Sequence, residues 1–395
     1  MKILIVVPDT GVGGVTASAV NFSNELTLRG HKVCFLDMSG ENGCAERLSE
    51  GVEMLSLSGR SRLWNIGGAS VSRARGLKKL GVLALGVVKK LTIRSGLWYR
   101  LIFSKFNNEE AFDVAVAFRQ CAPCYSFVLH EVKANRKIGF VHGEVTEMGD
   151  ISSWQKYMTK FDRIAYVSDA VKAGFIRVYP ELAANACTIY NTFNVGQILS
   201  KAEETPTIAF DPNKVNIVTV ARLTMQKNID RALRVCKMLK DADVRPFHWY
   251  VIGDGYLMEK LQSLATSLDI DDVLTFTGSM SNPFPLVKNA TFTVLPAAWE
   301  AYGMVVIESF ILGAPIAVTD YEALHELMTD GEFGLIAEQT DESLFEAVLR
   351  LLENRDGIRS TFRDRLQGYR FTNDTAYLQF INAIEAIHCK GHEKA

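Results

Sequence analysis

The stretch VNIVTVARLTMQKNIDRALRVCKMLK, residues 215–240, decides the fold, because an apolar strand-like run leads through a polar loop into an amphipathic helical pattern. The same succession continues to residue 318. Strands that alternate regularly with helices indicate a parallel sheet covered by helices on both faces. The runs that carry this pattern are 215–220, 229–239, 248–252, 257–268, 273–277, 291–295, 304–312 and 316–318.

The N-terminal half shows the same alternation and predicts a second sheet of the same kind. A strand-like run at 3–7, a glycine-rich turn at 11–14 and a helical pattern at 15–29 open it. With 395 residues, the chain suits two domains of about 200 residues each. Further strand-like runs lie at 33–36, 114–118, 137–141, 163–167 and 187–190.

A polar stretch between Asn194 and Asn213 interrupts the alternation and predicts a linker. We therefore expect an α/β protein of two Rossmann-like domains that face each other across a cleft. The N-terminal domain is expected at 1–198 and the C-terminal domain at 199–371. The helical pattern within 372–395 is expected to return to the N-terminal domain.

The net charge indicates which binding partners to expect, and the cysteines indicate the cellular compartment. The formal net charge of -2 gives no reason to expect nucleic acid as a partner. Residues 1–8 form a short apolar run that predicts a strand rather than a secretory signal. The seven cysteines are scattered, as is typical where thiols stay reduced, and we expect a cytoplasmic protein. Cys121 and Cys124 form a CxxC motif without a second pair, which we interpret as packing.

Two glycine-rich turns follow predicted strands. Gly13 and Gly14 precede a helical pattern, where backbone N–H groups can approach an anion. Gly253 and Gly255 form a second such turn, where the backbone can approach a nucleotide. A simple tight turn explains either pair equally well. The first turn lacks a complete GxGxxG, but Asp37 stands where a ribose-binding acid would lie, so a dinucleotide-dependent oxidoreductase stays open as an alternative.

Two cations, Arg222 and Lys227, follow the strand at 215–220. Fixed positive charge at the carboxyl end of a strand suits a diphosphate, because this leaving group gains negative charge as its bond breaks. A solvated pair of surface cations is the alternative interpretation.

Glu300 and Glu308 flank the start of a predicted helix. Backbone N–H groups between them would present the positive end of that helix to a phosphate. Carboxylates accept hydrogen bonds from paired hydroxyls, so one glutamate suits a donor sugar and the other a ribose. An ion pair with a nearby Arg or Lys is the alternative for each glutamate. The expected N–H groups belong to Tyr302, Gly303, Met304 and Val305.

The spacing of Glu300 and Glu308 resembles the EX7E motif of glycosyltransferase family 4. Other matches follow in that family's order along most of the chain, most strongly over 215–320. The resemblance implies a GT-B fold and a nucleotide-diphosphate sugar donor, with UDP as the expected nucleotide. It also implies transfer with retained anomeric configuration and without a required metal. The other matches are Gly13-Gly14, Gly30-His31, the Arg222 and Lys227 pair, Gly253-Asp254-Gly255, 278–283 and 313–318.

The resemblance also implies a role for each candidate residue. Arg222 and Lys227 would hold the diphosphate. Glu308 would hold the ribose and Glu300 the transferred sugar. His142, directly after a predicted strand, matches the family's N-terminal-domain histidine beside the donor sugar, whereas without the resemblance it is a core or capping histidine.

Three alanines depart from the family pattern. Ala297 and Ala298 stand where a serine is common, and Ala301 stands where glycine is usual. These departures bear on donor preference rather than on the class of enzyme.

Asp241 and Asp243 form a DxD triplet that could be mistaken for a metal site. The triplet lies between a helix and a strand, at the edge of the sheet opposite the expected site. We interpret it as a solvated loop and expect no metal.

Residues 54–108 contain no acidic residue, and basic side chains alternate there with aromatic and aliphatic ones. This composition is typical of a segment that lies on anionic lipid. Its longest apolar run, 80–88, is far shorter than the roughly 20 residues of a membrane-spanning helix. We therefore expect peripheral binding at the inner face of the plasma membrane. A basic loop over the acceptor site, or a nucleic-acid patch, is the alternative.

With the implications of the resemblance, these patterns predict a glycosyltransferase that moves a sugar from a nucleotide diphosphate to a saccharide acceptor during surface polysaccharide assembly. A polyprenyl-linked saccharide is the expected acceptor. Two other classes stay open, an oxidoreductase and a nucleotide-binding membrane partner without catalytic activity. The oxidoreductase would not need Glu300 or Glu308, and the partner would release no nucleotide from a sugar donor.

Overall fold

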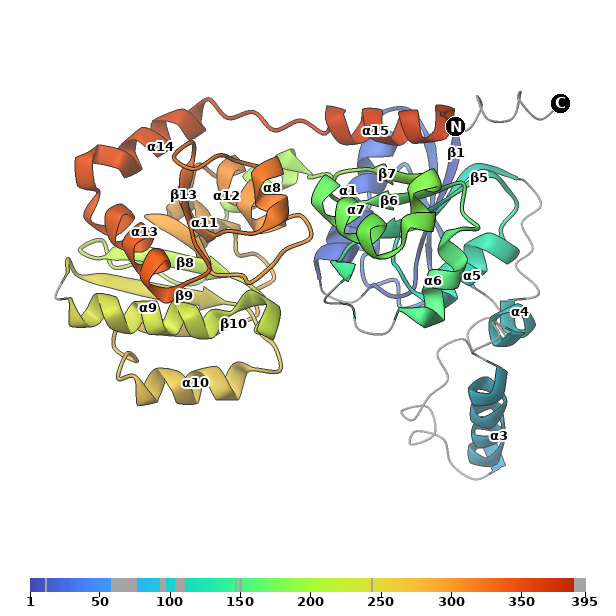
Figure 1. Ribbon diagram of the computed structural model, residues 1–395, viewed down its shortest axis with the longest axis horizontal. Coiled ribbons are helices and arrows are strands. Elements are labelled where there is room, and N and C mark those ends of the chain that lie inside the picture. Colours follow the sequence, from blue (N-terminus) through green and yellow to red (C-terminus); the bar gives the residue numbers. More distant parts are fainter. Residues whose placement is uncertain are drawn as a thin grey trace. The chain divides into compact units, whose positions relative to one another are not determined.

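The computed structural model describes residues 1–10, 13–57, 77–92, 97–103, 111–145, 148, 151–242 and 244–386. The chain divides into two compact units, Met1–Phe193 with Asn373–Ala395, and Asn194–Thr372. Each unit is built on one parallel sheet with helices on both faces (Figure 1). The prediction of two Rossmann-like α/β domains is therefore confirmed.

The sheet of the first unit has seven strands in the order β3-β2-β1-β4-β5-β6-β7, and every neighbouring pair is parallel. The central strand is fully buried from Ile3 to Val7, because helices cover both faces of the sheet. The strands are β1 (Lys2–Val7), β2 (Lys32–Asp37), β3 (Val52–Ser56), β4 (Phe112–Ala117), β5 (Ala134–Val141), β6 (Arg163–Tyr166) and β7 (Ala186–Thr188).

Helices cover this sheet on both sides, with local signals at their ends. The Ser168 hydroxyl accepts a hydrogen bond from the Val171 amide (3.1 Å) and so caps the start of α7. Asp169 in the first turn of the same helix complements the helix dipole. The helices on the sheet are α1 (Gly14–Leu28), α5 (Ala122–His130), α6 (Ser152–Met158) and α7 (Asp169–Val178), with 3-10 turns η1 (Ala45–Arg47) and η4 (Pro180–Asn185).

Two further helices of the first unit, α3 (Leu77–Thr92) and α4 (Leu97–Phe103), follow one another outside this layer (Figure 1). Helix α4 packs on α5 and buries Trp98 and Ile102. Helix α3 contacts α4. It therefore joins the unit through α4.

The last described helix, α15 (Asp374–Glu385), belongs to the first unit, as predicted. The Phe380 ring meets the Phe22 ring of α1 edge to face, with 5.2 Å between the centroids. Arg29 pairs with Asp374 at 2.5 Å. Buried aromatic contact and a flanking ion pair thus fix the returning helix on α1.

The sheet of the second unit has six strands in the order β10-β9-β8-β11-β12-β13, and every neighbouring pair is parallel. Trp249 in its core is fully buried, and its indole N–H donates to the Thr219 hydroxyl (3.0 Å). The strands are β8 (Val215–Val220), β9 (Phe247–Ile252), β10 (Leu274–Gly278), β11 (Phe292–Leu295), β12 (Ile316–Thr319) and β13 (Gly334–Ala337).

Seven helices of the described chain belong to this unit, and those between β8 and β12 alternate with the strands. The seven helices are α8 (Val195–Ala202), α9 (Ile229–Asp241), α10 (Met258–Ser267), α11 (Phe284–Asn289), α12 (Met304–Ile311), α13 (Asp341–Glu353) and α14 (Ile358–Gln367), with 3-10 turns η5 (Met225–Lys227), η6 (Glu322–Glu326) and η7 (Arg355–Gly357).

The second unit starts at Asn194, a few residues before the expected boundary between 198 and 199. The Asn194 side chain accepts a hydrogen bond from the Gln197 amide (2.9 Å) and starts α8 there. Helix α8 packs on α11, and the Asn282 side chain donates to the Lys201 carbonyl (2.8 Å). These contacts place the whole of α8 in the second unit.

Candidate active site

The loops after the parallel strands of the second unit lie together at the carboxyl edge of its sheet. The loop after β8 carries both predicted cations. Arg222 is exposed, and Lys227 ends η5. Asn228 then adopts a left-handed conformation (φ 50°) and α9 begins at Ile229, close to the helix start that the sequence predicts.

Lys227 forms an ion pair with Glu300, whose loop follows β11. Only 12% of the Lys227 side chain and 10% of the Glu300 side chain are exposed. The side-chain amide of Gln226 donates to the second Glu300 carboxylate oxygen (3.3 Å) and to the Trp299 carbonyl oxygen (3.1 Å). The structure therefore brings the predicted diphosphate cation and the predicted sugar carboxylate together.

The turn at Gly253 and Gly255 packs directly against the loop that carries Arg222. A Cβ atom at Gly253 would lie 1.8 Å from the Ala221 carbonyl oxygen, and one at Gly255 would lie 2.3 Å from that of Leu223. Two loop backbones can approach this closely only where side chains are missing. The glycines therefore shape the edge of the sheet, whatever the edge binds.

Helix α12 begins at Gly303, which adopts a left-handed conformation (φ 88°). A Cβ atom there would also lie 2.3 Å from the Tyr321 hydroxyl, so both the conformation and the space favour glycine. No acidic residue lies in the first turn of α12, which contains Met304 and Val305. Its N–H groups thus form a positive helix end beside the buried Tyr302.

Glu308 lies on the second turn of α12 and is partly buried. Its carboxylate has no hydrogen-bond donor among the residues that the structure describes. Burial raises the pKa of Glu308 to about 7, and the nearby Lys227 ammonium partly opposes this rise. Lys227 is thus close to both glutamates, and Glu308 holds acceptor oxygens that the described protein leaves unused.

His142 directly follows β5 in the first unit. Gly13 and Gly14 lie in the same unit, after β1 and at the start of α1. The His142 imidazole stacks on Phe140 (5.6 Å between centroids), and Nε2 lies 2.8 Å from the Phe118 carbonyl oxygen. Nε2 therefore carries the proton and Nδ1 is an acceptor. Burial lowers the pKa of His142 to about 4, so the ring is neutral at physiological pH.

Asp37 is fully buried at the end of β2, and its own loop uses its carboxylate. The oxygens accept from the Thr10 hydroxyl (2.9 Å), the Ser39 hydroxyl (2.7 Å) and two backbone amides. A ribose would have to displace these donors. The structure thus gives Asp37 a role in shaping its loop rather than the role that a dinucleotide-binding acid would need.

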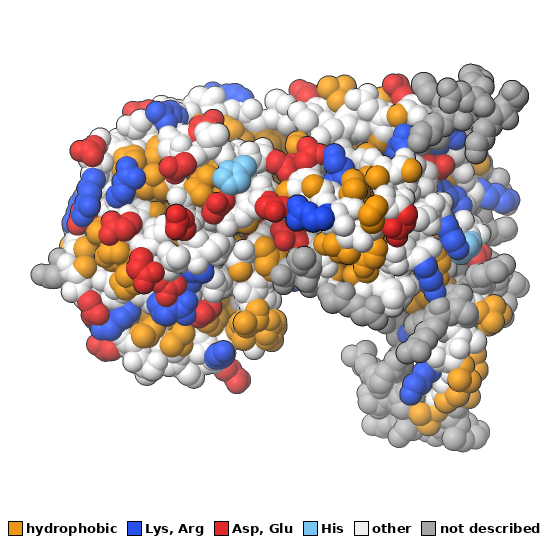
Figure 2. All heavy atoms as spheres, in the orientation of Figure 1, with side chains coloured by type: hydrophobic (Ala, Val, Ile, Leu, Met, Phe, Trp, Pro, Cys, Tyr) orange, Lys and Arg blue, Asp and Glu red, His pale blue; other side chains and the backbone are white. Residues whose placement is uncertain are grey.

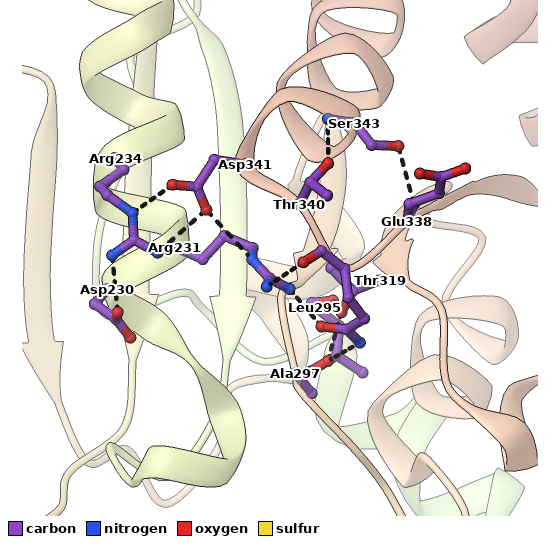
Figure 3. A network of polar contacts seen from close by, with 11 residues as sticks. Asp230, Arg231, Arg234, Leu295, Ala297, Thr319, Glu338, Thr340, Asp341 and Ser343 are labelled. Atoms are coloured by element: carbon purple, nitrogen blue, oxygen red, sulfur yellow. Dashed lines mark hydrogen bonds and ion pairs between the residues drawn. The ribbon is translucent and has the colours of Figure 1, made fainter.

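A polar network that the sequence analysis missed lies beside the Glu300 loop. Figure 3 shows Arg231 and Arg234 of α9 directed at Asp341, which starts α13. The Arg231 Nε lies 3.4 Å from Asp341, and the same guanidinium donates to the Gln339 side chain (2.5 Å). The network ties the start of α9 to the loop after β13.

Metal-ligand clusters and membrane-spanning helices are both absent from the part of the chain that the structure describes. Among those residues, no group of three or more His, Cys, Asp or Glu side chains could hold a metal ion. Within the same part of the chain, no helix is both long and apolar enough to cross a membrane. Asp241 pairs with Lys237 (2.6 Å), and Asp243 lies outside the described residues.

The chain is similar in sequence to known bacterial proteins. An uncharacterized 41.2 kDa protein in the cps region of Klebsiella pneumoniae is 23% identical over 348 residues, 86% of each chain. The Campylobacter jejuni N-acetylgalactosamine-N,N'-diacetylbacillosaminyl-diphospho-undecaprenol 4-alpha-N-acetylgalactosaminyltransferase is 28% identical over 179 residues, which are 45% of this chain and 47% of that enzyme.

The fold is similar to that of solved glycosyltransferases. A mutant of S. aureus TarM, in complex with fondaparinux, alpha-GlcNAc-glycerol and UDP, superposes with a TM-score of 0.70 at 12% identity, over 97% of this chain and 99% of that one. Residues 200–368, which contain every candidate residue of the second unit, match the family of glycosyl transferases group 1. The chain as a whole has the GT-B fold. Residues 200–368 form a group 1 glycosyltransferase domain, and the chain is a glycosyltransferase.

Proposed function

We propose that this glycosyltransferase belongs to the retaining family 4 enzymes and takes its sugar from a nucleotide diphosphate, with UDP as the nucleotide. The observation that carries the proposal is the cluster of Lys227, Glu300 and Glu308 beside the N-terminus of α12. A cation, a positive helix end and two carboxylates within one cluster match the parts of a nucleotide sugar. The UDP complex of the similar TarM fold supports the choice of nucleotide.

The diphosphate is the part of the donor whose charge changes during the reaction. Breaking the sugar–phosphate bond leaves a more negative diphosphate, which Arg222, Lys227 and the amides of Met304 and Val305 would stabilise. Positive groups that are already in position need no reorganisation as the charge develops. We propose that transfer therefore proceeds without a divalent metal.

The two glutamates suit the two sets of hydroxyls in the donor. The partly buried Glu308 carboxylate has unused acceptor oxygens, and a pair of ribose hydroxyls would supply the missing donors. Glu300 would accept hydrogen bonds from the transferred sugar while Lys227 and Gln226 hold it in place.

His142 suits binding rather than proton transfer. Its Nε2–H is engaged by the Phe118 carbonyl, so Nδ1 can accept a hydrogen bond from a sugar hydroxyl. A ring whose pKa burial lowers to about 4 is not an effective general acid at neutral pH. We propose that Gly13 and Gly14 present backbone amides to the substrate in the same unit.

The relatives support a lipid-linked saccharide acceptor and a role in surface polysaccharide assembly. The Campylobacter relative is named for a diphospho-undecaprenol saccharide, and the Klebsiella relative lies in a cps region. We propose that this chain likewise extends a polyprenyl-linked saccharide at the cytoplasmic face of the plasma membrane.

Helix α3 supports membrane binding within the segment 54–108. Leu83, Val87 and Leu91 are exposed on it, and Lys89 and Lys90 lie in its last turn. Figure 2 shows hydrophobic and basic side chains together on this exposed helix. Such a surface suits anionic lipid. Residues 58–76, 93–96 and 104–108 of the predicted segment lie outside the described residues.

The test is nucleotide release from a panel of UDP- and GDP-sugars, measured with and without a chelator. We expect slow UDP release from one UDP-sugar, unchanged by the chelator, and a product with the anomeric configuration of the donor. Release that requires magnesium or manganese, or an inverted product, would contradict the mechanism. Binding of nucleotide without any release would favour the non-catalytic alternative.

A further inference from the structure

Gln339 follows β13 and connects two loops of the candidate active site. Its side-chain amide nitrogen donates to the carbonyl oxygens of Ala297 (3.0 Å) and Ala298 (3.2 Å), in the loop that carries Glu300. The same nitrogen donates to the Asp320 carbonyl oxygen (2.6 Å) at the end of β12. One side-chain amide thus forms hydrogen bonds with the loops that follow two neighbouring strands, β11 and β12.

The other end of Gln339 is held by Arg231 in the first turn of α9. Its side-chain oxygen accepts from the Arg231 guanidinium at 2.5 Å, and its backbone carbonyl accepts from the same group at 2.7 Å. Arg231 is buried, with 9% of its surface exposed. Arg231 lies four residues after Lys227, just inside α9. We call the pair formed by Gln339 and Arg231 the Gln339–Arg231 bridge. It connects the segment that carries Lys227 to the loop that carries Glu300.

Two further hydrogen bonds fix the loop that carries Glu300. The Ala298 amide donates to the Gln226 carbonyl (2.9 Å), and the Thr319 hydroxyl donates to the Ala297 carbonyl (2.6 Å). The bridge is therefore one side of a hydrogen-bonded frame around residues 297–300, with Gln226 on the other side.

We propose that Gln339 and Arg231 are positioning residues, which set the distance between Lys227 and Glu300 for the reaction. This inference rests on the proposed function of that pair. A glutamine suits the position because its side-chain N–H groups donate to the carbonyl oxygens while its side-chain oxygen accepts from a guanidinium. Glutamate at this position would keep the contact with the Arg231 guanidinium but would lose the N–H donor. Its negative charge would then repel the three carbonyl oxygens that now accept from Gln339. Methionine, of similar size, would keep neither contact.

The experiment compares Gln339→Met and Gln339→Glu with the control Gln262→Met, which changes an exposed glutamine on α10. We expect both Gln339 variants to lower kcat roughly tenfold to hundredfold, because small displacements of reacting groups cost that much. UDP affinity should fall less than kcat does, since Gln339 would act on the nucleotide only through the position of Lys227. Amide hydrogen exchange in residues 297–303 should accelerate in both variants and stay unchanged in the control.

A double variant tests whether the two residues act as one unit. If they do, Arg231→Met should lower kcat, and adding Gln339→Met should cost little more. Fully additive losses, or Gln339 variants with control-like kcat and hydrogen exchange, would overturn the inference. Loss of folding in both Gln339 variants would also overturn it in favour of a purely structural role. A wild type without nucleotide release would instead overturn the proposed function, and hydrogen exchange would still report on the bridge.

Discussion

The Lys227 ammonium and the Glu300 carboxylate form an ion pair from which water is largely excluded, although the two residues are 73 positions apart in sequence. One follows β8 and the other follows β11, which are adjacent parallel strands. Their meeting is a direct consequence of the sheet order. A diphosphate bound near Lys227 would interact with the same ammonium that now neutralises Glu300.

Removing one partner of this pair should destabilise the second unit. We expect Lys227→Met to lower the free energy of unfolding by about 3 kcal/mol, because it leaves the Glu300 carboxylate buried without its cation. Adding Glu300→Gln should restore part of the loss. Lys237→Met, which removes an exposed pair with Asp241, should cost less than about 1 kcal/mol. Chemical denaturation of the four proteins measures these differences, and equal losses for the two lysines would refute the prediction.

The raised pKa of Glu308 makes stability depend on pH. Its pKa is about 7 in the folded chain and about 4.3 in an unfolded one, so the folded state binds the proton more tightly. The contribution of Glu308 is therefore most favourable below pH 4.3 and is lost as the pH rises through 7. We expect Glu308→Gln to raise the melting temperature relative to the wild type at pH 8 and to change it little at pH 5. The opposite trend would mean that donors not seen in this structure stabilise the carboxylate.

The start of α12 and the place of Glu308 on its second turn were predictable, because Gly303 ends the loop and an apolar helical run follows. Glycine at 253 predicted a turn, but the reason for it, a clash with the Ala221 carbonyl, depends on a loop of another strand. Gln339 could not be identified from the sequence, because it follows β13, a strand of only four residues, and its partners lie 19 to 108 positions away.

Changing Arg222 should affect the chemical step more than donor binding. Arg222 is exposed in this structure, and we assign it to the charge that develops on the departing diphosphate. Arg222→Ala is therefore expected to lower kcat by at least tenfold and to change the donor KM by less than about threefold. Steady-state kinetics with the preferred donor measures both constants. An increase in KM alone would assign Arg222 to ground-state binding instead.

Helix α3 should bind anionic vesicles through its exposed apolar residues. We expect Val87→Glu with Leu91→Glu to abolish flotation with anionic vesicles, because the charges oppose both the apolar contact and the lipid charge. Leu28→Glu on α1 is the matched control, since Leu28 is also exposed in the first unit. Flotation that does not depend on lipid charge or salt would argue against membrane binding through α3, and so would flotation that is unchanged in the double variant.

The most direct test of the assigned nucleotide site is calorimetric titration of UDP into the wild type, Glu308→Gln and the control Glu346→Gln, which changes an exposed glutamate on α13. Ribose hydroxyls bind an ionised carboxylate more strongly than a protonated carboxyl group, so wild-type affinity should increase as the pH rises from 6 to 8 across the pKa of about 7. We predict that Glu346→Gln keeps this behaviour, whereas Glu308→Gln binds UDP at least tenfold more weakly at pH 8 and loses the pH dependence. Equal UDP affinity for all three proteins at both pH values would contradict the assignment of Glu308 to the nucleotide site.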